Sequence, residues 1–216
     1  MIASDPLSPL LAVAIKGLIG RLVVASLILA LFGTALAAAK ARLRGAAGES
    51  RVRRLLRRLG LPSVHDVIVA APDGSLTQID HVALTGQGLV VIETKNYSGV
   101  ILGTPRDRHW TQVLGRSRHR FQNPLRQNHK HILALNHQLS ISVASLVVFV
   151  GNARFPDGPP GGVVTLHQAG HTLAGFGRPD SGQCEGPVWQ KLLALTRAGR
   201  GLGAAHRAGL RRRRAP

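Results

Sequence analysis

The sequence predicts an α/β protein: a helix, a three-stranded antiparallel meander, a second helix and a buried strand, preceded by one transmembrane helix. Three observations predict this order. Residues 22–39 form an uncharged apolar run, residues 64–97 hold short strand-like segments joined by Gly-containing turns, and apolar residues at helical spacing flank those segments. A hydrophobic content of 44% is sufficient for a packed core and excludes a globally disordered chain.

The apolar run is the first element. Its 18 positions carry no charge, which is about the length that a helix needs to cross a hydrocarbon core. A cleaved signal peptide is the alternative, because residues 37–39 are small, but the run exceeds the roughly 7–15 residues of a signal core. Eight Lys or Arg lie within residues 40–58, against two before the run. The length of the run predicts a transmembrane anchor at about residues 22–39 within an N-terminal segment 1–45, and the positive-inside rule predicts a cytoplasmic C-terminal portion.

A helix and the meander open the second segment, residues 46–151. Apolar residues at i, i+3, i+4 and i+7 from Val52 predict an amphipathic helix that ends at Gly60. The strands follow. They are expected at 64–70, 76–84 and 89–97, joined by the tight turns "PDG" and "TGQG".

The rest of the chain continues from a loop rich in Arg and His. Residues 123–139 resume helical spacing, and residues 143–151 read as a buried strand. Residues 152–196 are an expected extension of the core, with one more strand and a closing helix. Residues 197–216 contain seven Arg and no acid, which predicts a disordered basic tail.

The net charge of +18 indicates a polyanionic partner, either nucleic acid or an anionic membrane face. A single cysteine, Cys184, excludes an internal disulfide framework and a multi-cysteine zinc site. The ten histidines do not show the spacing of a zinc protease motif.

Three charged residues stand beside the ends of the predicted strands. Glu93 and Lys95 share one strand face, and pairing across "TGQG" brings Asp80 alongside. Two carboxylates from neighbouring strands can converge on Mg²⁺ or Mn²⁺, and a Lys beside them can act on the attacking water or the phosphate. The alternative is an ordinary cross-strand ion-pair cluster on a solvated face.

Several separated blocks resemble one family. "AAGESRVRRLL", "QIDHVALTGQGLVVIETKNYSGVI", "HW" and "FQNPLRQNHKHILAL" are similar to the nuclease-related domain family of the PD-(D/E)XK, restriction-endonuclease-like superfamily. The resemblance covers about residues 46–151. It implies a restriction-endonuclease-like core, in which a mixed sheet is flanked by helices.

The resemblance also implies roles for individual residues. Asp80 and Glu93 would hold the metal ion, with the Thr94 carbonyl as a third ligand. Lys95 would position or activate the water, with Glu49 completing the site and Gln78 on the Asp80 face. The family's "NPL-x-Q" block falls on Asn123, Pro124, Leu125 and Gln127, where it would shape the site or touch substrate.

Arginines and aromatic residues alternate in the Arg-rich loop. They could hold a phosphate backbone and stack on bases, or the loop could be solvated with Trp110 in the core. The expected nucleic-acid contacts are Arg106, Arg108, Arg116, Arg118, Arg120 and Gln127. These features together predict a membrane-anchored, Mg²⁺-dependent (or Mn²⁺-dependent) nuclease acting on DNA rather than RNA. A non-catalytic binding module of the same fold and a secreted nuclease are the alternatives.

Overall fold

A computed structural model describes residues 7–212 of the chain, and the side chains of Lys16, residues 21–199 and residue 201. The chain separates into two compact units, Met1–Arg44 and Gly45–Pro216. The expected division into segments 1–45, 46–151, 152–196 and 197–216 stays a prediction.

Helix α1 (Leu7–Leu59) is the longest element. We expected separate helices before and after residue 45, but one continuous helix covers both. The intervening residues are mainly Ala, Arg and Leu, which favour helix strongly enough to carry it through Gly45 and Gly48. From Arg21 onward the helix is long and apolar enough to cross a membrane. Its most apolar 18-residue stretch has a mean hydropathy of 2.4, and no residue of that stretch is buried.

The larger sheet lies in the second unit and contains five strands in the order β1-β2-β3-β7-β9. The first three pair antiparallel, which confirms the meander, while β7 and β9 pair parallel to their neighbours. Its strands are β1 (Ser63–Ala70), β2 (Leu76–Thr85), β3 (Gly88–Lys95), β7 (Ala144–Phe149) and β9 (Val163–Thr165).

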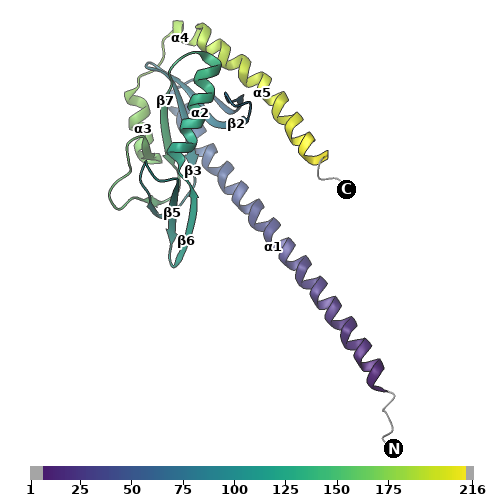
Figure 1. The fold of residues 1–216 in the computed structure, drawn as a ribbon. Coiled ribbons are helices and arrows are strands. Elements are labelled where there is room, and N and C mark those ends of the chain that lie inside the picture. Colours follow the sequence, from purple (N-terminus) through teal and green to yellow (C-terminus); the bar gives the residue numbers. More distant parts are fainter. Residues whose placement is uncertain (1–6, 213–216) are drawn as a thin grey trace, which may run out of the picture. The chain divides into compact units, whose positions relative to one another are not determined.

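Helices cover both faces of this sheet (Figure 1). On one face, α2 (Pro124–Leu139) and α5 (Pro187–Arg212) bury apolar residues against β1, β2 and β3. On the other face, residues 45–59 of α1 and helix α3 (Leu166–Gly175) pack against β2, β3 and β7. The strands of the centre are therefore buried on both sides, which explains their nearly continuous apolar sequence.

A second sheet replaces the loop that we expected at residues 106–121. Its order is β6-β5-β4-β8, and β5 and β6 form an antiparallel hairpin that extends beyond the first sheet in Figure 1. The hairpin was missed because exposed Arg and His occupy half of β6, leaving little apolar alternation to reveal a strand. The strands are β4 (Gly99–Leu102), β5 (His109–Leu114), β6 (Ser117–Gln122) and β8 (Ala153–Arg154).

The C-terminal region also differs from expectation. The short helix α4 (Ser181–Glu185) precedes α5, which continues to Arg212, although we expected a disordered tail from residue 197. Ala, Leu and Arg dominate this stretch, and their helix propensity outweighs the repulsion of like charges. Residues 213–216 lie outside the described residues.

Candidate functional site

Asp80 and Glu93 face one another where two strands part. The β2–β3 ladder ends at the pair His81–Ile92, so the next step would place Asp80 opposite Glu93. The β1–β2 ladder also lacks a pair at this point, between Asp66 and Asp80. Instead of continuing the ladder, the Oδ2 of Asp80 accepts a hydrogen bond from the backbone N–H of Thr94 at 2.8 Å. Two carboxylates therefore share one face at an opening in the sheet.

Glu93 is buried, with only 2% of its side chain exposed. Its Oε1 lies 2.8 Å from Nζ of Lys95, and its Oε2 lies 3.2 Å from Nε2 of His131. The His131 contact is a close electrostatic approach without hydrogen-bond alignment, since both atoms are buried without a hydrogen-bond partner among the described residues. Burial raises the pKa of Glu93, but the contacts with His131 and Lys95 outweigh burial and hold this pKa below its ordinary value.

The pKa of Asp80 shifts in the opposite direction to that of Glu93. Burial raises its pKa, the neighbouring Glu93 charge raises it further, and the Thr94 N–H and Lys95 only partly oppose this, so the pKa of Asp80 reaches about 7. A carboxyl group with this pKa is half protonated near neutral pH. A cation bound beside Asp80 would oppose the shift, because it would offset the repulsion from Glu93, which is the second cause after burial.

Lys95 is fixed between two partners. Its ammonium group donates to Oε1 of Gln127 at 2.9 Å in addition to the Glu93 contact, and its side chain is 17% exposed. A cluster this buried is not the solvated ion-pair cluster that we considered from the sequence. The two partners restrict the Lys95 side chain, which keeps a small exposed fraction.

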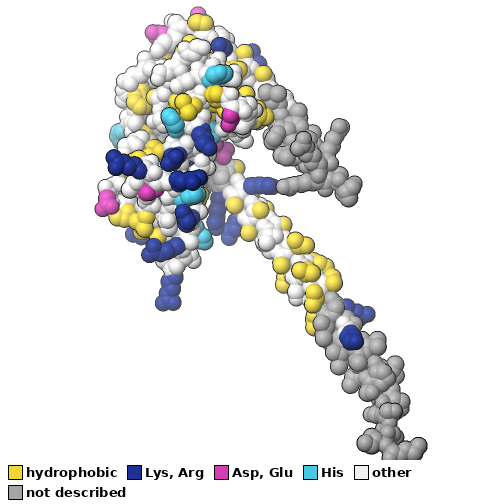
Figure 2. Space-filling model, viewed as in Figure 1, with side chains coloured by type: hydrophobic (Ala, Val, Ile, Leu, Met, Phe, Trp, Pro, Cys, Tyr) yellow, Lys and Arg dark blue, Asp and Glu magenta, His cyan; other side chains and the backbone are white. Residues whose placement is uncertain are grey.

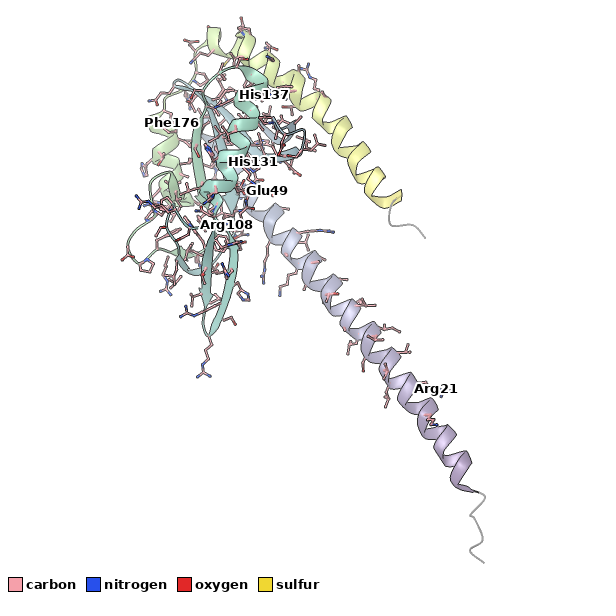
Figure 3. All side chains as sticks on the ribbon, viewed as in Figure 1. Arg21, Glu49, Arg108, His131, His137 and Phe176 are labelled. Carbon is pink, nitrogen blue, oxygen red and sulfur yellow. The ribbon has the colours of Figure 1, made fainter. Side chains whose placement is uncertain are left out.

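Glu49 reaches the same site from α1 (Figure 3). A Cβ on the preceding Gly48 would lie 2.9 Å from a Val150 methyl and 3.0 Å from Cβ of Asn96, so only glycine permits this close helix–sheet approach. Burial raises the pKa of Glu49, and the charges of Asp66 and Glu93 add to the effect. Glu49 is therefore part of the same electrostatic group as the strand carboxylates.

Gln78 is linked to strand β1 through Asp66. Its Nε2 donates to Oδ1 of Asp66 at 3.1 Å, while the other Asp66 oxygen lies 3.3 Å from the guanidinium of Arg53. Asp66 adopts φ of +56°, a left-handed conformation that is uncommon for a residue other than glycine. Sequence reasoning missed Asp66, because nothing in "VHDVIVA" distinguishes it from an exposed strand residue.

The "NPL-x-Q" block has two separate tasks. Asn123 caps α2 by accepting from the Leu125 N–H at 2.9 Å, and its Nδ2 lies within hydrogen-bond distance of the carbonyls of Thr104, Pro105 and Asp107. It therefore fastens the loop that carries Arg106 and Arg108 to the start of the helix. Gln127, one turn into the same helix, holds Lys95.

His131 is the other residue that sequence reasoning missed. It follows Gln127 by four positions, so both face the sheet from one side of α2. Its Nδ1 lies 2.8 Å from the Thr77 hydroxyl, and this contact fixes the ring against Glu93. The helical spacing from Gln127 is the signal that could have identified His131.

The arginines among the expected nucleic-acid contacts are exposed to solvent, whereas Gln127 is half-buried and bound to Lys95. Lys and Arg gather on the face shown in Figure 2, and all five predicted arginines, from Arg106 to Arg120, are exposed. The aromatic residues do not join them. Trp110 is fully buried and Phe121 packs on Tyr97 with ring centres 4.5 Å apart, so neither is placed to stack on bases.

The described residues supply donors for a metal ion without forming a closed cage. No group of three or more His, Cys, Asp or Glu in this part of the chain converges as a preformed site. Asp80 and Glu93 are nevertheless the donor type that Mg²⁺ prefers, and Mg²⁺ commonly uses one or two carboxylates together with waters and substrate phosphate. The observation that fits a bound cation is the placement of Asp80 opposite the buried carboxylate of Glu93, where the β2–β3 ladder ends.

Comparison with known proteins agrees with the family resemblance. Residues 44–150 match the family model described as the nuclease-related domain. An uncharacterised protein of Bacillus anthracis is 44% identical over 95 residues, which cover 43% of this chain and 45% of that protein. The chain thus spans less than half the length of this relative. No solved structure matches the chain.

Proposed function

Residues 44–150 of the chain belong to the nuclease-related domain family, and from that premise we propose that the protein is a membrane-anchored, Mg²⁺-dependent nuclease that hydrolyses phosphodiester bonds in DNA. Its core would be restriction-endonuclease-like. The observation that carries the proposal is the Asp80–Glu93 pair at the strand opening, with the ammonium group of Lys95 only 2.8 Å from Glu93.

Asp80 and Glu93 would hold Mg²⁺ or Mn²⁺, with the Thr94 carbonyl as a further ligand and Glu49 completing the site. Bound there, the ion would polarise a phosphoryl oxygen and lower the pKa of a bound water. Lys95 would present its ammonium group to the attacked phosphate or to that water. Gln127 and His131 would keep Lys95 and Glu93 in place, and Gln78 would steady Asp66 beside them.

The exposed arginines would bind the nucleic-acid backbone. A chain with 28 basic and 10 acidic residues attracts any polyanion, and its affinity should fall steeply with salt. DNA is the favoured substrate and RNA the alternative. Arg106 and Arg108 are the best placed of these residues, because Asn123 ties their loop to the helix that carries Gln127.

The apolar part of α1 would anchor the protein with its domain in the cytoplasm. Its length, its mean hydropathy of 2.4 and the excess of positive charge after residue 39 support this arrangement. Protease added to intact cells should leave the domain uncut. Digestion from outside, or release into the medium, would instead support a secreted nuclease.

A non-catalytic nucleic-acid-binding module is the second candidate. It is favoured by the neutralisation of Glu93 by Lys95 and by the lack of a preformed three-donor cluster among the described residues. DNA cleavage separates the two candidates. We would incubate the purified chain with plasmid and linear DNA in Mg²⁺, Mn²⁺ or chelator, using Lys95→Ala as the test variant and exposed Lys191→Ala as its matched control.

The nuclease proposal predicts metal-dependent cleavage by the wild type and by Lys191→Ala, and its loss in Lys95→Ala. A folded wild-type protein that binds DNA but does not cleave it with either ion would favour the binding module.

A further inference from the structure

A cavity of about 610 Å³ adjoins the candidate site. It lies between the β1–β2 turn, the beginning of β2 and one side of α2, and the end of β6 closes it with Gln122. This volume suits a ligand of nucleotide size, because small-molecule sites usually enclose about 300–1,000 Å³. The proposed hydrolysis does not require such a cavity, so its lining calls for a separate explanation.

Part of the lining is apolar although it is exposed. Leu76 and Leu133 line the cavity and are 39% and 47% exposed, and Pro72 also lines it. Large aliphatic side chains left in water at a concave surface offer contact area for a flat ring. They offer nothing to a phosphate group or a free metal ion.

The remaining lining is polar and nearly neutral in sum. Gln78, Gln122 and Gln127 contribute side-chain amides, each of which carries both donors and an acceptor. Lys130 and Asp73 contribute one charge of each sign, and the Lys130 charge is close enough to Asp73 to lower its pKa slightly, after the larger effect of Ser75. Mixed donors and acceptors of this kind recognise the edges of nucleobases.

Two lining residues also belong to the candidate site. Gln127 holds Lys95 at 2.9 Å, and His131 lies 3.2 Å from Glu93. A ligand in the cavity would therefore sit within one residue of the groups that face the scissile phosphate. A nucleotide next to that phosphate is the part of a nucleic acid that can reach both places.

We propose that this cavity binds one unstacked nucleobase of the nucleic-acid substrate, with its ring against Leu76 and Leu133 and its polar edge toward Gln122 and Gln127. The assignment rests on the proposed function, since nucleic acid is taken as the substrate. It implies that single-stranded segments or frayed ends, whose bases unstack easily, are preferred over an intact duplex.

The test uses the full chain in detergent, with chelator present so that no cleavage can occur. The probe is a short single-stranded DNA that carries one 2-aminopurine, whose fluorescence rises when the base leaves its stack. Leu133→Ala and Gln122→Ala remove one apolar and one polar wall. Their matched controls are Leu102→Ala and Gln87→Ala, which change exposed residues of the same types outside the cavity.

We expect wild type and both controls to raise the fluorescence at least twofold, and the two cavity variants, saturated with the same probe, to give less than half of the wild-type rise. Unchanged fluorescence on binding, or cavity variants equal to their controls, would overturn the assignment. Because cleavage plays no part, a protein that unstacks the probe but never cuts DNA would refute the proposed hydrolysis and leave the base site standing.

Discussion

Replacing Asp80 by Asn should stabilise the metal-free protein near neutral pH and destroy its response to divalent ions. Asn keeps the side-chain oxygen that accepts the Thr94 N–H, so the local hydrogen bond survives. It removes the carboxylate whose repulsion with Glu93, together with burial, raises the pKa of Asp80 to about 7. A substitution that stabilises the fold while abolishing metal binding is expected of a ligand and not of a structural residue.

The sign and size of the change in the free energy of unfolding follow from the linkage between folding and proton binding by Asp80. The folded state binds the Asp80 proton more tightly than the unfolded chain, so without metal this group stabilises the fold fully below pH 3.8. That stability is lost as the pH rises toward 7. The interval between 3.8 and about 7 corresponds to a loss on the order of 4 kcal/mol, at about 1.4 kcal/mol for each pKa unit. Mg²⁺ at a concentration one hundred times its dissociation constant should raise the free energy of unfolding by about 2.7 kcal/mol.

The assay is urea unfolding of the full chain in mild detergent, followed by tryptophan fluorescence at pH 5 and pH 8. Both tryptophans of the sequence, Trp110 and Trp189, are buried in the second unit, so the signal reports on that unit alone. Comparing variant with wild type at each pH cancels the contributions of other titrating groups.

Asp73→Asn is the matched control, because Asp73 is exposed in a turn and the hydroxyl and N–H of Ser75 lower its pKa. This control should not stabilise the protein at pH 8. Asp80 is not a metal ligand with a raised pKa if Asp80→Asn is no more stable than wild type at pH 8 without metal, or if it gains as much stability from Mg²⁺ as wild type does.

Three further predictions follow from the same structure. Lys95→Arg keeps the positive charge but cannot readily lose a proton, so the cleavage rate should fall by about 10²–10⁴-fold if Lys95 acts on the water. Full activity of this variant would mean that Lys95 contributes only its positive charge. Replacing Arg118 and Arg120 by Gln should reduce the slope of log affinity against log salt by about 2, and an unchanged slope would remove the hairpin from the DNA contact. His81, whose pKa burial lowers to about 3, stabilises the fold above pH 6.5, and this stability is lost as the pH falls toward 3. In urea unfolding, His81→Gln should reduce the decrease in the free energy of unfolding as the pH falls. A variant with the wild-type pH profile would contradict the role of His81 in that decrease.

Much of the fold could be predicted from the sequence, because its core elements are strongly periodic. The apolar spacing through Val52 and Leu56 marks the end of α1, and the tight turns mark the meander. The β5–β6 hairpin could not be predicted in the same way. Its stability depends on Trp110 packing against Phe149 of the other sheet, a contact between residues 39 positions apart that no local pattern reveals.

Some residues of the candidate site could likewise be predicted from local patterns, and others could not. Asp80, Glu93 and Lys95 are neighbours through strand pairing, so alternation and turn length suffice to bring them together. His131 and Asp66 are brought in by tertiary packing. His131 depends on how α2 lies on the sheet, and Asp66 depends on a left-handed backbone conformation within β1.

One measurement tests most directly whether Asp80 and Glu93 hold the ion that hydrolysis requires. The single-turnover rate of cleavage of an end-labelled DNA strand is measured over a Mn²⁺ titration, while electron paramagnetic resonance counts the bound Mn²⁺ in the same samples. If Asp80 and Glu93 hold the catalytic ion, the cleavage rate and the Mn²⁺ occupancy rise together with the same half-saturation, and both are lost in Asp80→Asn. Cleavage that persists in chelator, or Mn²⁺ that binds Asp80→Asn as tightly as wild type, would contradict it.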